Sequence, residues 1–99
     1  MRPFESAPRP VVGYSHDYPS GHYTGMHRHP RAQLLFAVAG VMRITTGSAL
    51  YVIPPGTGLW VPANEEHGVR MDGVSRMRAL FLRADAAVAG PAETTVIAV

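Results

Sequence analysis

The sequence predicts an all-β fold, a sandwich or barrel built from short strands. Three observations support this: apolar residues form short runs, glycines close several of these runs, and no segment keeps a capped helical period of 3.6 residues. The 10 glycines and 9 prolines are spread along the 99 residues, as expected where turns separate strands. A chain of this length forms a single domain.

About eight runs rich in Val, Ile, Leu, Tyr or Phe are expected to form the strands, at a spacing of about 8 to 12 residues. In chain order they cover residues 11–15, 32–40, 41–47, 48–56, 58–63, 67–73, 75–83 and 94–99. Four of them end at a glycine: Gly40, Gly47, Gly56 and Gly73.

The remaining segments are expected to be irregular. Residues 1–10 hold three prolines and few apolar side chains, which predicts an N-terminal arm before a barrel of residues 11–99. Residues 85–93 resemble a helix, but Gly90 and Pro91 break the pattern and favour a loop. Residues 34–38, "LLFAV", are apolar on both faces of a strand, and such a strand is covered twice. A second copy of the chain is one such cover, so a homodimer is expected.

Composition excludes several classes of function. The chain has no cysteine, so disulfides and thiolate metal sites are excluded, and cytoplasmic localisation is expected. All nine basic residues are arginines scattered along the chain, and the net charge is only +2, which argues against nucleic-acid binding by this chain. No apolar run is long enough to cross a membrane, and the N-terminus lacks the apolar core of a signal peptide.

The histidines predict a metal site. His27 and His29 lie two residues apart, so on a strand both side chains point to one face. A turn at Pro30 then brings Gln33 back beside them, and in a barrel His67 from a distant strand can reach the same cavity. Three imidazoles and one amide oxygen suit one divalent transition metal, Zn, Ni, Fe, Mn or Cu. The alternative is that these are surface histidines or hydrogen-bonded core histidines.

Residues 21–40 and 56–71 resemble the two sequence motifs of the cupin superfamily. In the first, Gly21 is followed by five residues, His27-Arg28-His29, three residues, Gln33, six residues and Gly40. In the second, Gly56 is followed by five residues, Pro62-Ala63-Asn64, two residues, His67, three residues and Met71. The resemblance implies a double-stranded β-helix, or jelly-roll barrel, with a metal held at the positions of His27, His29, Gln33 and His67.

This chain departs from the cupin motifs at three positions. Gln33 replaces a glutamate, Asn64 a glycine and Met71 an asparagine. Asparagine tolerates a positive φ better than most residues, so the turn at Asn64 is expected to survive. Without the glutamate charge, a divalent site keeps a net charge of +2, which weakens metal binding but favours an anionic ligand such as a carboxylate, phenolate or diketone. Gln33 as an ordinary polar residue beside an empty pocket is the alternative.

The resemblance is closest to the N-terminal, ligand-sensing cupin domain of AraC-type transcription regulators. It rests on residues 21–44, 51–67 and 76–83 and on glutamine at position 33, which is common in that branch. It implies a small-molecule sensor that dimerises and passes its signal to helix-turn-helix units. Because the sequence stops at Val99, where those units would begin, the chain is either the sensor part of a longer regulator or a stand-alone relative.

The residues leave a second function open, a small metal-dependent enzyme of the dioxygenase or isomerase type. The sequence favours a binding module, since it offers no evident nucleophile or general base, and no catalytic residue is predicted. Glu65 and Glu66, before His67, are either solvated or support that histidine. A ligand pocket is expected at His22, Phe36, Met42, Trp60, Met71, Met77 and Phe81. The alternative is a surface position for His22 and plain core for the others.

Overall fold

The fold is built from antiparallel strands, as predicted. A computed structural model describes residues 11–82 and 91–98, and every regular element within these ranges is a β-strand. The strands are β1 (Val11–Tyr18), β2 (Ala32–Thr46), β3 (Leu50–Ile53), β4 (Thr57–Val61), β5 (His67–Leu82) and β6 (Thr95–Ala98). The predicted arm at residues 1–10 and most of the predicted loop at residues 85–93 lie outside the described residues. The described part contains no helix of the length and apolarity needed to cross a membrane.

Two long strands replace four of the expected short ones. β2 joins the runs at residues 32–40 and 41–47, and β5 joins those at residues 67–73 and 75–83. Gly40 and Gly73 have positive φ angles of 78° and 77°, yet neither ends a strand. The register between β2 and β5 shifts twice between Ala37 and Val41, as at a β-bulge, so the glycines bend the strands instead of ending them.

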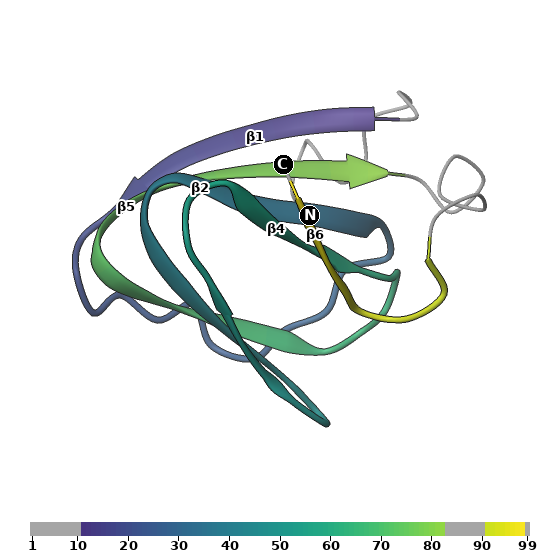
Figure 1. The fold of residues 1–99 in the computed structure, drawn as a ribbon. Helices are drawn as coiled ribbons and strands as arrows, with labels where there is room; N and C mark the ends of the chain where they lie inside the picture. The colour runs from purple at the N-terminus through teal and green to yellow at the C-terminus, as the bar shows by residue number, and fades with distance from the viewer. Residues whose placement is uncertain (1–10, 83–90, 99) are drawn as a thin grey trace.

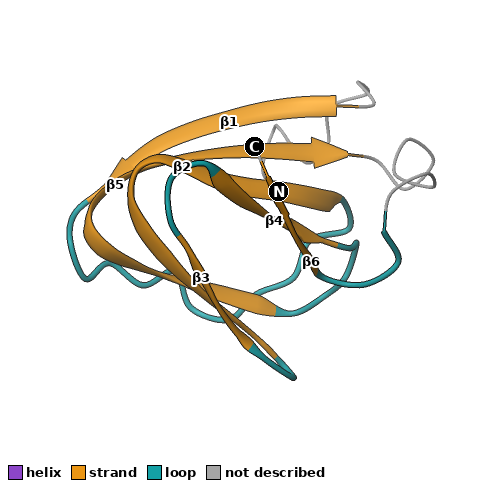
Figure 2. Cartoon of the chain, viewed as in Figure 1, coloured by secondary structure: helices purple, strands orange, loops and turns teal. Residues whose placement is uncertain are grey.

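The bend carries each long strand from one layer of the fold into the other. Figure 1 shows β2 and β5 curving together, with the β2–β3 hairpin projecting from the second layer. The sheet order is β1-β5-β2-β4-β6, with β3 paired to β2. Figure 2 shows that loops, drawn in teal, connect the strands at the rims of the two layers.

The bulge also changes which residues of β2 face inward. Before it, Gln33, Leu35 and Ala37 are buried, whereas after it Met42 and Ile44 are buried. The inward face therefore moves from odd to even positions, which simple alternation along one strand does not predict. Buried residues of β2 through β5 form one core: Leu35, Ala37, Met42, Ile44, Ile53, Leu59, Val61, Val69, Met71, Met77, Ala79 and Phe81.

Residues 19–31 act as an irregular additional strand along the first half of β5. The backbone N–H of Gly21 donates to the carbonyl of Met71 at 2.8 Å, and that of Thr24 donates to Val69 at 2.9 Å. This pairing holds the segment that carries the first two histidines of the predicted metal site against the strand that carries the third.

Candidate metal centre

The backbones of His27 and His67 pair directly. They form an isolated antiparallel bridge, in which the N–H of His27 donates to the carbonyl of His67 at 2.9 Å and the N–H of His67 donates back at 2.8 Å. The two imidazole rings lie 4.6 Å apart between centroids. The sequence prediction placed His27 and His29 on a regular strand, whereas only His27 forms a bridge. A bridge to β5 is nevertheless enough to aim His27 at His67.

The hydrogen bonds of His27 and His67 set the tautomer of each ring. Nδ1 of His27 lies 2.9 Å from the carbonyl oxygen of Gly25, and Nδ1 of His67 lies 2.9 Å from that of Glu65. A carbonyl only accepts, so in the neutral rings the hydrogen sits on Nδ1 and the lone pair on Nε2. Glu65 therefore supports His67 through its backbone carbonyl. This is the arrangement that metal-binding histidines use to present Nε2 to an ion.

His29 is held by the turn at residues 62–65. The backbone N–H of Asn64 donates to the carbonyl of His29 at 2.7 Å, and Asn64 has a φ of 65°. The positive φ expected of this asparagine is confirmed. The ring of His29 also meets Phe81 edge to face, with centroids 5.3 Å apart and planes at 79°. The two motifs of the sequence therefore meet in one structure, because the second motif positions a histidine of the first.

The three histidines converge on one point. His27 is half-buried, His29 and His67 are buried, and one ring nitrogen from each lies within 4.8 Å of the others. Imidazole nitrogens bind transition metals at about 2.0–2.1 Å, so two ligands of one ion lie at most about 4.2 Å apart. Small rotations of the side chains bring the set into that range. The described residues thus contain a three-histidine cluster that can hold a metal ion.

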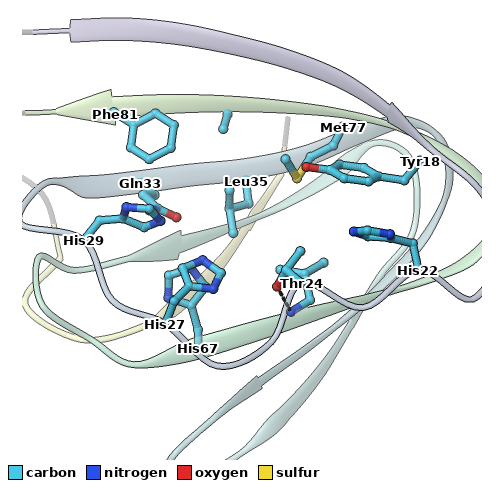
Figure 3. A pocket seen from close by; sticks show the side chains of 12 residues that line it. Tyr18, His22, Thr24, His27, His29, Gln33, Leu35, His67, Met77 and Phe81 are labelled. Atoms are coloured by element: carbon cyan, nitrogen blue, oxygen red, sulfur yellow. Dashed lines mark hydrogen bonds between the residues drawn. The ribbon is translucent and has the colours of Figure 1, made fainter. Parts of the chain in front are cut away.

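Gln33 lies beside this cluster with its amide nitrogen unsatisfied. It comes from β2, is 2 % exposed and lines the same cavity as the histidines. Its Nε2 is buried and has no hydrogen-bond partner. Figure 3 shows the Gln33 amide next to the ring of His29. A buried amide nitrogen without a partner is unfavourable, so this one fits a site completed by a group that the chain does not itself supply.

Burial lowers the pKa of His67 below its usual value. Loss of solvation is the largest cause, and the neighbouring His27 adds to it, while the Glu65 carbonyl and carboxylate act in the opposite direction. The neutral imidazole is therefore favoured, and the neutral form is the one that binds metals.

A cavity of about 390 Å³ opens from the histidines into the fold. Of the residues predicted to line a pocket, His22, Met77 and Phe81 do so. Met42 and Met71 pair across β2 and β5 beyond the bulge and are fully buried in the core. Phe36 lines a shallow outer groove with Leu80, and the Trp60 indole donates to the carbonyl of Pro91 at 2.8 Å. These four side chains lie outside the cavity lining, because the bulge and the strand alternation turn them elsewhere.

Five residues of the cavity wall were missing from the prediction. They are Tyr18, Thr24, Leu35, Val69 and Ala79. A signal for some of them was present: Ala79 lies between Met77 and Phe81 on one face of β5, and Leu35 shares its face of β2 with Gln33. Reading the faces of both strands from the predicted ligands outward would have found these residues.

Comparison with known proteins agrees with this structure. Residues 14–83, most of the chain, match the family model described as "Cupin domain". A cupin superfamily protein from Desulfitobacterium hafniense superposes with a TM-score of 0.72 at 19 % identity, covering 79 % of this chain and 72 % of that one. The oxalate decarboxylase of Bacillus subtilis, studied for its Mn(II) centres, superposes with a TM-score of 0.71 at 13 % identity, covering 77 % of this chain and 22 % of that one.

A curated relative is similar in sequence. The HTH-type transcriptional regulator NimR of Escherichia coli K12 is 30 % identical over 61 residues, which are 62 % of this chain and 22 % of NimR. The chain thus spans about a fifth of the length of that regulator. The solved structures confirm the predicted fold, and the family match covers both sequence motifs. The chain belongs to the cupin family.

Proposed function

We propose that this chain is a metal-binding, ligand-sensing cupin domain of the kind found in AraC-type transcription regulators. The observation that carries the proposal is the convergence of three histidines beside a 390 Å³ cavity, two of them with Nε2 set as the free lone pair. The similarity to NimR, a transcriptional regulator, supports a sensory role for such a site.

His27, His29 and His67 would hold a divalent transition metal, and the Gln33 amide offers its oxygen as a fourth donor. Such an ion supplies a Lewis acid to an oxygen of the bound small molecule. All four protein donors are neutral, so the site keeps the full charge of the ion and favours an anionic ligand. The buried rings exclude water from one side and so strengthen that attraction.

As a sensor of this type, the domain would work in the cytoplasm as a homodimer. Contact with DNA would belong to helix-turn-helix units, not to this barrel. Scattered arginines, several of them paired with acidic residues such as Arg43 with Asp72 and Arg76 with Asp17, give no basic stripe among the described residues. Sedimentation velocity on the purified chain tests the dimer.

A second candidate is a small metal-dependent enzyme of the dioxygenase or isomerase type. The observation that favours it is the same cluster, because three protein nitrogens beside a cavity leave coordination positions for a substrate. Oxygen uptake or product formation by iron- or manganese-loaded protein with small carboxylates or diketones would favour the enzyme. Ligand binding without turnover would favour the sensor.

Elemental analysis tests the metal site itself. Protein made without a metal-affinity tag is expected to retain about one equivalent of a transition metal, and His67→Ala is expected to lose it. His16→Ala is the matched control, because His16 is an exposed histidine that does not line the cavity. If wild-type protein dialysed against Zn, Ni, Fe, Mn and Cu salts retains no more metal than His67→Ala, the proposed site is refuted.

A further inference from the structure

The cavity has two chemically different ends. Figure 3 shows His27, His29, His67 and Gln33 together at one end, and Tyr18, His22 and Met77 at the other, with Leu35 between them. We infer that the ligand of this site is a monocarboxylate with an uncharged aromatic body. The inference rests on the proposed function and adds the chemical class of the ligand.

The carboxylate belongs at the histidine end. The three ring nitrogens that would hold the metal cation gather there with the amide of Gln33, so the charge able to neutralise an anionic head would lie at this end. The unsatisfied Nε2 of Gln33 adds a second reason, because this buried N–H group has no acceptor among the described residues and a carboxylate oxygen can accept from it.

The middle of the cavity suits an uncharged body. Its wall is apolar and comes from β2 and β5, through Leu35, Val69, Met77, Ala79 and Phe81. The lining residues that the structure describes include no Arg, Lys, Asp or Glu. A second carboxylate reaching away from the histidines would lose its hydration without gaining a cationic partner, which is strongly unfavourable.

Aromatic rings bound the cavity at both ends. At the far end, His22 stacks on Tyr18 with centroids 4.7 Å apart and planes at 26°, and His16 packs against the same Tyr18 at 4.3 Å. At the near end, Phe81 packs against His29. Figure 3 shows the thioether of Met77 beside Tyr18. Rings and a flexible thioether make favourable contacts with an aromatic body of varied shape.

Isothermal titration of zinc-loaded protein with three acids tests the inference. Acetate carries the head alone, benzoate adds the ring, and terephthalate adds a second carboxylate on the far side of that ring. Measured at pH 8, where imidazole is ordinarily neutral, benzoate is expected to bind roughly 30-fold more tightly than acetate, since the ring buries apolar surface. Terephthalate is expected to bind at least about 10-fold more weakly than benzoate, because its second charge is desolvated without a partner.

Two variants on β5 locate the effect. Met77→Gln keeps the size of the side chain but places an amide in the cavity wall, and it is expected to remove about 10-fold of the preference for benzoate while leaving acetate affinity unchanged. Val74→Gln is the matched control, because Val74 is 70 % exposed on the same strand and does not line the cavity. If Met77→Gln fails to fold, the series on wild-type protein decides alone.

Equal affinity for acetate and benzoate, or for benzoate and terephthalate, overturns the inference about the ligand. If the protein still binds one equivalent of zinc in that case, the proposed metal site is unaffected. Benzoate binding that is unchanged after the zinc is removed with a chelator also overturns it, because the carboxylate then does not lie at the histidines. Failure to retain zinc refutes the proposed function instead, so the two failures are distinguishable.

Discussion

Replacing Gln33 with methionine is expected to stabilise the metal-free protein while weakening its hold on metal. The side chain is 2 % exposed, its Nε2 has no hydrogen-bond partner, and methionine has a similar length and volume. A buried polar group without a partner costs about 1–3 kcal/mol, and an apolar replacement of the same shape removes that penalty. We therefore expect Gln33→Met to raise the free energy of unfolding by about 1–2 kcal/mol.

Urea unfolding in the presence of a chelator measures this change. For a domain of about 100 residues, it corresponds to a rise in the melting temperature of roughly 5–15 °C. The same variant is expected to retain less metal after dialysis, because it loses the amide oxygen beside the three histidines. Removing an unpaired N–H group stabilises the metal-free protein, whereas removing the oxygen donor weakens metal retention, so the two measurements change in opposite directions.

Thr94→Val is the matched control for this prediction. Its hydroxyl is the other buried side-chain atom without a hydrogen-bond partner among the described residues, and Thr94 does not line the cavity. This variant is expected to stabilise the protein without changing metal retention. If metal-free Gln33→Met is less stable than wild type while Thr94→Val is more stable, Gln33 has a structural partner and the reasoning about its orphaned amide fails.

Three further predictions concern the bend, the turn and His67. Gly40→Ala is expected to destabilise the protein by about 2–4 kcal/mol, since a Cβ there would lie 2.7 Å from the carbonyl oxygen of Val74 and the backbone would be strained at φ 78°. Gly73→Ala is the control: with φ 77° and open space around the new Cβ, it should cost only about 1–2 kcal/mol. Equal losses of unfolding free energy in denaturant titrations would refute the role of the close contact. Asn64→Val is expected to reduce both stability and metal retention, because a β-branched residue tolerates φ 65° poorly. Asn64→Gly should preserve both properties. Identical behaviour of the two variants would show that the turn does not position His29. In metal-free protein, the lowered pKa of His67 means that the unfolded chain binds more protons than the folded one. The contribution of His67 to stability is therefore complete above the unfolded pKa of about 6.5 and is lost as the pH falls toward the folded pKa. His67→Gln should flatten this part of a stability–pH curve measured by urea unfolding, and an unchanged slope would contradict the lowered pKa of His67.

Much of the site could be predicted from the histidines together with the resemblance of the sequence to the two cupin motifs. His27, His29 and His67 converge as expected, because the two motifs that contain them fix their distances along the chain. Asn64 adopts the positive φ that its place in the second motif requires. The pocket was harder to predict: four of the seven expected lining residues lie outside the cavity, because they were chosen for their apolar character rather than for the face they occupy. Whether Gln33 binds the metal remains a prediction.

The sequence by itself determined that this protein is an all-β cupin domain with a cluster of histidines. Apolar runs and the spacing of residues within each motif are properties of the sequence itself, so they can be recognised without the structure. Only the tertiary structure decided which side chains share the cavity with those histidines. The reason lies at the bulge near Gly40, where the register of β2 against β5 shifts and the inward face changes from Leu35 to Met42. That shift depends on the pairing of two distant strands, and no local pattern in either strand records it.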